Sequence, residues 1–182
     1  MVSQKETERI AACSIEHSDG SFLRKLIGEL TQSLQEVVGE RECAGFIGIV
    51  GTRVGHDINE QYRDALKLQR LNREQVAAVL LDLKRRIGGD FYILEENDRR
   101  LVLGNRRCPF GDLVRGRPSL CMMTSSVFGV VAARNLGYAK VDVEKAIARG
   151  DSECRVTIYL DEREAALAEG REYFRVETEM EL

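Results

Sequence analysis

The chain has 182 residues, of which 43% are hydrophobic and 31% charged, a composition typical of one folded globular domain. Its formal net charge of -3 argues against the basic surface that binding to DNA, RNA or an anionic membrane would require. No stretch approaches the roughly 18 apolar residues of a membrane span, and the polar N-terminus lacks the apolar segment of a secretory signal. We therefore expect a cytoplasmic protein with neither a membrane nor a direct nucleic-acid partner.

The first half of the chain predicts helices. Apolar residues recur at helical spacing between Phe22 and Val38, with Ser18 or Ser21 as the N-cap and Gly39 at the end. Another helical pattern covers 72–87 and ends at a pair of glycines.

The helical stretch between them, 44–68, is unusual because it contains four glycines. Glycine inside a helix costs roughly 1 kcal/mol relative to alanine, so four of them predict close helix packing, for instance across a dimer interface. The alternative is a turn at 50–53. The glycines are Gly45, Gly48, Gly51 and Gly55.

The second half predicts antiparallel strands around one buried helix. Residues 120–136 are apolar on nearly every side of a helix, and 155–160 alternate between apolar and polar as a half-buried strand does. A hairpin signal at 96–98 separates two β-prone runs. The remaining strand predictions are 90–94, 99–103, 138–148 with a turn, and an edge strand at 173–176.

Helices followed by antiparallel strands indicate an α+β fold. We expect N-terminal helices packed on an antiparallel sheet, with a buried helix between strands. The chain would form one domain over 1–182. It would be helical over 1–89, mixed β/α with a cysteine site over 90–160, and acidic in a tail over 161–182.

Three of the five cysteines stand where predicted elements begin or end. Cys108 lies in the loop after the hairpin, Cys121 in the first turn of the apolar helix, and Cys154 at the start of the alternating strand. An odd number of cysteines in a cytosolic chain argues against a disulfide framework. Thiolates suit zinc and iron–sulfur clusters. Because no Cys-x-x-Cys pair is present, the spacing alone leaves plain burial open as the alternative.

Several short motifs around these cysteines resemble the methanogen output domain, a small signalling domain, over roughly 85–160. They are Cys-Pro-Phe-Gly (108–111), Pro-Ser-Leu-Cys (118–121), Val-Phe-Gly-Val (127–130), Gly-Tyr-Ala-Lys-Val (137–141) and Ala-Arg-Gly-Asp-Ser-Glu-Cys (148–154). The chain is more distantly similar to the 4-vinyl reductase domain and the TRAPP-related ligand-binding fold. It also resembles the cysteine-containing half of the iron–sulfur-assembly repressor, which shares the Cys-x12-Cys spacing and the Gly-Asp-x-x-Cys turn.

The resemblance implies a non-enzymatic sensory or signal-transduction domain, dimeric and acting on a signalling protein partner. It implies that Cys108, Cys121 and Cys154 hold a cofactor, an iron–sulfur cluster as in the repressor or zinc as in some 4-vinyl reductase sensor domains. A fourth ligand is not evident, and the candidates are Cys43, Asp112, Glu153, water or a small molecule.

Two other functions are open. The TRAPP-related fold implies a module for a small apolar ligand, with structural cysteines and a pocket lined by Met122, Met123 and Phe128. An enzyme with a reactive thiol at Cys108 is the third hypothesis.

Arginines are frequent in the sequence around Cys108, and they predict a positive field that meets an anion or a partner. The alternative is a solvated face. Arg99 and Arg100 begin this set, and the residues expected to make the contact are Arg106, Arg107, Arg115 and Arg117.

Overall fold

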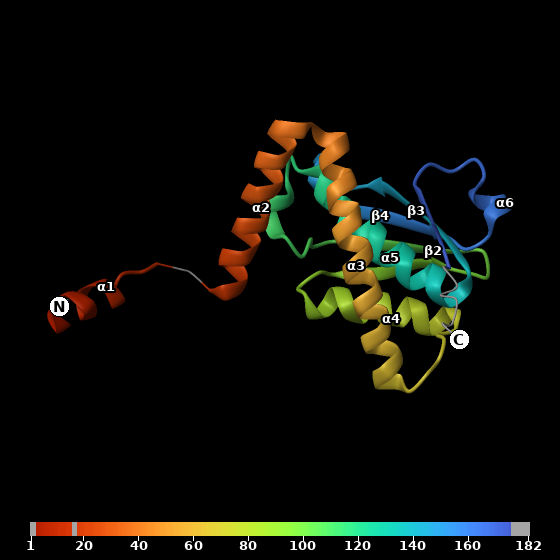
Figure 1. Cartoon of the computed structure of the whole chain (residues 1–182), viewed down its shortest axis with the longest axis horizontal. Helices are drawn as coiled ribbons and strands as arrows, with labels where there is room; N and C mark the ends of the chain where they lie inside the picture. The colour runs from red at the N-terminus through yellow and green to blue at the C-terminus, as the bar shows by residue number, and fades with distance from the viewer. Residues whose placement is uncertain (1–2, 16–17, 176–182) are drawn as a thin grey trace, which may run out of the picture.

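The computed structural model describes residues 3–15 and 18–175, in which helices cover one face of a five-stranded sheet and the N-terminal helix stands apart from the rest (Figure 1). The helices are α1 (Gln4–Ala11), α2 (Asp19–Val38), α3 (Glu40–Leu66), α4 (Arg73–Arg86), α5 (Cys121–Leu136) and the short α6 (Glu162–Ala165). The strands are β1 (Phe91–Glu96), β2 (Arg100–Asn105), β3 (Tyr138–Lys145), β4 (Cys154–Tyr159) and β5 (Arg171–Phe174). Short 3-10 turns are η1 (Gly111–Val114), η2 (Pro118–Leu120) and η3 (Ile147–Arg149).

The sheet is antiparallel throughout, with the strand order β1-β2-β4-β3-β5. The predicted α+β class is confirmed. The edge strand lies two residues earlier than predicted, and the end of that prediction, residue 176, is outside the described part. None of the helices in the described ranges is long and apolar enough to cross a membrane.

Helix α5 is the buried helix that the apolar run predicts. It lies between α3 and the sheet, and Phe128 at its middle is fully buried in the main core (Figure 1). Leu103 and Val156, side by side on β2 and β4, belong to the same core. The helix ends at Gly137, whose φ of 105° is in the region that favours glycine.

The glycines of α3 explain how closely α3 approaches α5. A Cβ atom on Gly51 would lie 2.8 Å from the Cβ of Ser126 and 3.3 Å from the Cα of Met123. On Gly55 it would lie 3.0 Å from the Cβ of Val130. Close helix packing is therefore confirmed, but the partner is α5 of the same chain. Helix α3 continues through 50–53, so the alternative of a turn there is wrong.

Helix α4 begins at Asn72, which forms a capping box with Gln75. Its buried face includes Val76 and Leu80, as the helical spacing predicts. Lys84 continues that face one turn further and is only 4% exposed.

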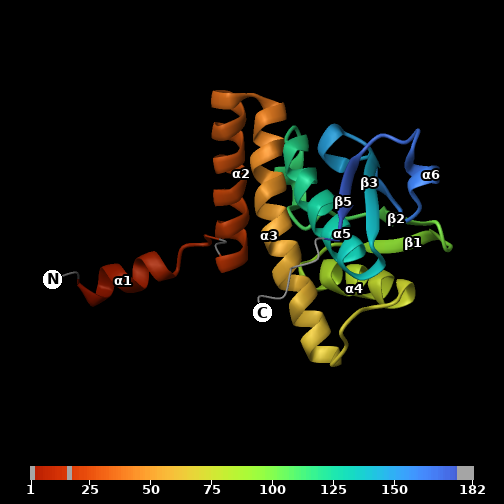
Figure 2. The same cartoon turned by 45° about the vertical axis from the view of Figure 1, so that its right-hand side comes forward.

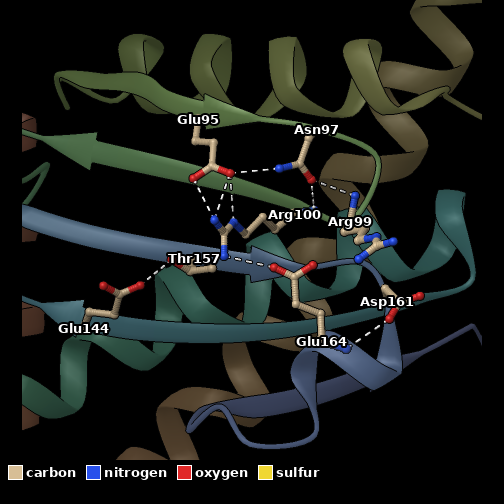
Figure 3. Close-up of polar contacts among 8 residues, drawn as sticks. All are labelled: Glu95, Asn97, Arg99, Arg100, Glu144, Thr157, Asp161 and Glu164. Carbon is tan, nitrogen blue, oxygen red and sulfur yellow. Dashed lines mark hydrogen bonds and ion pairs between the residues drawn. The ribbon is translucent and has the colours of Figure 1, made fainter.

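Polar side chains tie the hairpin end of the sheet together (Figure 3). The Arg100 guanidinium donates two hydrogen bonds of 3.0 Å to Glu95 and one of 2.9 Å to Glu164, linking β1, β2 and α6. Asn97 accepts from the backbone N–H groups of Arg99 and Arg100 in the turn. In the pairing of β2 with β4, Cys154 lies opposite Asn105 at one end of β2. Arg99 and Arg100 lie at the other end of that strand. Their predicted place around Cys108 is wrong.

The candidate cysteine site

Cys108, Cys121 and Cys154 line one cavity. Cys108 follows β2, Cys121 is the first residue of α5, and Cys154 opens β4. All three are free and half-buried. The cavity has a volume of about 30 Å³, roughly the room of one or two water molecules. Its other walls are mainly apolar: Phe91, Asn105, Pro109, Phe110, Val114, Leu120, Thr124, Val143 and Val156.

Two of the sulfur atoms accept N–H hydrogen bonds. The Sγ atom of Cys154 accepts from Asn105 Nδ2 at 3.6 Å and from the backbone N–H of Ile147 at 3.5 Å. The Cys108 sulfur accepts from the backbone N–H of Phe110. Donors aimed at sulfur stabilise a thiolate relative to a thiol.

A buried ammonium group faces the same thiols. Lys84 Nζ donates a hydrogen bond of 2.8 Å to Thr124 Oγ1 and lies 5.0 Å from the ring centre of Phe128 and 5.4 Å from that of Phe91. Its protonated form is favoured by Cys108, Cys121 and Cys154 when these are thiolates. Within the described residues, no carboxylate forms an ion pair with it. A buried charge without an opposite charge is costly.

Burial dominates the ionisation of this cluster. It raises the pKa of the Cys108 thiol above its ordinary value and that of Cys121 to about 12. It lowers the pKa of Lys84 from 10.5 to about 8. With nothing bound, both thiols therefore stay protonated at neutral pH, which is unfavourable for a nucleophilic thiol at Cys108.

The lowered pKa of Lys84 predicts a pH dependence of stability. Between about pH 8 and 10.5 the unfolded chain holds the Lys84 proton more tightly than the folded protein does, so this residue makes the free energy of unfolding rise with pH. Relative to Lys84→Met, we expect the metal-free protein to gain about 2 kcal/mol between pH 8 and 10. Urea unfolding in chelator and reductant measures this.

The comparison with Lys84→Met is needed because the thiols act in the opposite direction. Cys108 and Cys121 keep protons in the folded state that the unfolded chain loses near pH 9, which lowers stability as pH rises. Both proteins contain these thiols, whose pKa values Lys84 itself lowers, so their difference reports the lysine together with its coupling to the thiols. A constant difference across the pH range would mean that Lys84 is not titrating in a buried site.

The cysteines share a cavity but do not form a ready-made ligand set. In residues 3–15 and 18–175, no three His, Cys, Asp or Glu side chains are grouped so that they could hold a metal ion as they stand. A bound ion would require the sulfurs to close in. A single ion fits the volume of about 30 Å³. A multi-iron cluster with its sulfides is larger, so it would also require the loop 106–120 to move outward.

None of the three candidate fourth ligands lines the cavity. Cys43 is buried in α3, with its Sγ atom 3.7 Å from the carbonyl oxygen of Thr31. The Asp112 side chain is 96% exposed. Glu153 accepts a hydrogen bond from Tyr92. The other candidates, water or a small molecule, remain.

The side chains predicted for an apolar pocket also lie elsewhere. Phe128 belongs to the main core, and Met123 packs against that core beside α3. Met122, like these two, is absent from the cavity walls.

Each of the four arginines expected to meet an anion or partner contacts a group of its own chain. Arg106 stacks on Tyr92 and lies 3.6 Å from Asp90, and Arg107 donates to the carbonyl oxygen of Gly88. Arg115 pairs with Asp112, and Arg117 pairs with Glu29.

The loop 106–120 lies between the cavity and α2. Its residues Cys108, Phe110 and Leu120 line the cavity. On its other side, Ser119 Oγ donates to Gln35 Oε1 at 3.0 Å, and the ion pair of Arg117 with Glu29 spans 3.9 Å. The cavity is thus separated from α2 by a single loop.

Lys84, Asn105 and Thr124 are not among the site residues predicted from the sequence. One signal for Lys84 is present, since it follows Val76 and Leu80 at a spacing of four and so falls on the apolar face of its helix. For Asn105 and Thr124 the sequence contains no comparable signal.

Comparisons with solved structures show which proteins have a similar fold. The fold is shared with sensory and trafficking domains. The phenol-responsive sensory domain of the transcription activator PoxR, in a structure with phenol, matches with a TM-score of 0.59 and 11% identity over 80% of this chain and 76% of that one. Trafficking protein particle complex subunit 3 from Naegleria fowleri, covalently bound to palmitic acid, matches with a TM-score of 0.58 and 14% identity over 87% and 98%.

The chain belongs to the family methanogen output domain 1, whose model matches residues 26–159. This confirms the resemblance found in the sequence, and it extends the match into the N-terminal helices. A family of output domains and neighbours that are sensory or trafficking domains agree with a non-enzymatic signalling role. Curated protein sequences give no significant match.

Proposed function

We propose that this output domain senses its signal by binding a thiolate-coordinated metal centre, zinc or an iron–sulfur cluster, through Cys108, Cys121 and Cys154. One observation carries the proposal: three free cysteines from three separate elements share a cavity, and the buried Lys84 is hydrogen-bonded to Thr124 in its wall, with no carboxylate paired to the lysine among the described residues. We further propose that the domain works in the cytoplasm as a homodimer and passes its state to a signalling protein.

Charge balance supports a thiolate site. A divalent ion that binds three cysteines displaces three protons and leaves a centre with one negative charge. Lys84 supplies one positive charge beside the same three sulfurs. Binding would therefore neutralise a buried ammonium group that is otherwise uncompensated. An anionic iron–sulfur centre would have the same benefit.

The size of the cavity favours a single ion. Zinc prefers four ligands, and sensing requires that one of them can change. With three thiolates in place, the fourth position would face the apolar walls of the cavity, where water or a small molecule could bind. Occupancy of that position would then alter the loop 106–120.

The proposal is tested on protein purified without oxygen. Its visible absorption spectrum is recorded, and its content of iron, zinc and sulfide is measured by elemental analysis. Stoichiometric zinc without colour supports a mononuclear centre. Iron with sulfide and a brown colour supports a cluster. Protein that stays metal-free after reconstitution with Zn²⁺, or with ferrous iron and sulfide, refutes the proposal.

A small apolar ligand is the second candidate, and the mainly apolar cavity walls favour it. The sensory domain of PoxR is similar in fold and was solved with phenol, and the trafficking subunit carries palmitic acid. A ligand as large as phenol would have to widen the cavity. Native mass spectrometry should then detect a co-purified organic molecule on metal-free protein. Absence of such a molecule, together with stoichiometric metal, would exclude it.

A further inference from the structure

Helix α2 exposes a stripe of large apolar side chains. Leu30 is 61% exposed and Val37 is 83% exposed. Their spacing places them on one face of the helix. The members of the stripe that are classed as exposed are Phe22, Leu23, Leu26, Ile27, Leu30 and Val37.

The surroundings of α2 do not cover this stripe. Its buried residues are Gly28 and Thr31, so the first two turns contain none. Helix α3 runs beside α2 (Figure 2) and adds further exposed apolar side chains. These are Phe46, Ile49, Val50 and Val54.

The exposed apolar area of α2 and α3 is as large as that of a protein–protein interface. A free aromatic side chain offers ~150–250 Å² and an aliphatic one somewhat less, so these ten, which are about half exposed, present on the order of 800 Å². The largest apolar patch of a typical monomer is about 300–600 Å². A stable dimer buries about 800 Å² on each partner. The α2–α3 surface therefore suffices for a dimer.

The stripe is not interrupted by charge between Phe22 and Val37. The charged residues of this segment, Arg24, Lys25, Glu29 and Glu36, fall at the edges of the stripe or beyond them. A second copy related by a two-fold axis can therefore lay the same stripe against it without burying a charge.

We infer that α2 pairs antiparallel with α2 of a second copy, about a two-fold axis at Leu30. This register sets Leu23 opposite Val37. It deepens and rests on the homodimer in the proposed function. This α2 surface is not the dimer interface that the glycines of α3 suggest in the sequence, because the glycine face of α3 packs on α5.

The test is the mass in solution, measured by sedimentation velocity from about 1 to 100 µM. The wild-type chain should sediment as two copies of 20.5 kDa. Leu30→Glu places two carboxylates at the axis, and we expect at least a hundred-fold weaker association. Gln32→Glu makes the same charge change on the other side of α2 and should leave the mass unchanged. A mixture of Leu30→Glu and Leu30→Lys chains should restore dimers.

A disulfide tests the register directly. In a Cys13→Ser background, which removes the exposed thiol, Leu30→Cys should cross-link between copies under mild oxidation. Lys25→Cys should not, because this register places Lys25 away from its own copy. A monomeric wild-type chain at 100 µM, or equal dissociation constants for Leu30→Glu and Gln32→Glu, overturns the inference. Metal analysis of each variant separates this outcome from failure of the cysteine proposal, since Leu30→Glu leaves all three cysteines intact.

Discussion

Replacing any one of Cys108, Cys121 and Cys154 by serine should abolish binding of the proposed metal centre. Serine keeps the shape of the side chain but has a weakly acidic hydroxyl that cannot replace a thiolate on zinc or iron. Changes outside the ligand shell already cost about 10–100-fold in metal affinity. We therefore expect losing a direct ligand to cost at least about a hundred-fold. Metal content after dialysis against a weak chelator measures the effect.

The matched control is Cys13→Ser, because Cys13 is exposed and lies in a different region of the chain. It should keep the metal content of the wild-type protein. Circular dichroism of each variant checks that the fold survives. If all three single variants keep full metal content, the cysteine site is not the metal site. If only one of them does, that residue is not a ligand and another group completes the set.

Gly51→Ala should destabilise the domain, although alanine is the better helix former. The added Cβ would lie 2.8 Å from the Cβ of Ser126 and 3.3 Å from a backbone atom of Met123, so α3 and α5 would have to move apart. Overpacking of this kind costs about 1–3 kcal/mol, more than the roughly 1 kcal/mol that alanine gains in helix propensity. We expect the free energy of unfolding in urea to fall by about 1 kcal/mol, the difference between the two effects.

Gly45→Ala is the opposite case on the same helix. Nothing lies within 4 Å of a Cβ at Gly45, so only the helix propensity changes. We expect this variant to be more stable than wild type by up to about 1 kcal/mol. If Gly51→Ala were as stable as Gly45→Ala, the close approach of α3 to α5 would be refuted.

The elements with a strong local pattern could be predicted from sequence. The uninterrupted apolar character of 120–136 defines α5, because only a helix surrounded by protein tolerates it. The hairpin between β1 and β2 follows from its turn residues. The cavity was predictable in outline, because Cys108, Cys121 and Cys154 stand at the ends of elements that meet at one end of the sheet.

What could not be predicted depends on partners from distant elements. The glycines of α3 indicate a close approach but not which helix makes it, and the answer is α5. The spacing of Lys84 places it on the apolar face of α4, but it does not show that the rings of Phe91 and Phe128 lie beside its ammonium group. The predicted range of strand β5 is two residues too late. A shift of two residues keeps the same side chains on the same face of the sheet, so the alternating pattern does not distinguish the two positions.

The loop 106–120 connects the cavity to helix α2, because it contacts both. It lines the cavity with Cys108 and contacts α2 through Ser119 and Arg117. If binding in the cavity shifts this loop, it changes the association constant of α2 by some factor. Thermodynamic reciprocity then requires that association change the affinity of the cavity by the same factor. The local concentration of the domain would then set its sensitivity: if the factor exceeds one, clustering of the protein in the cell lowers the signal level at which it responds, and if the factor is below one, clustering raises it.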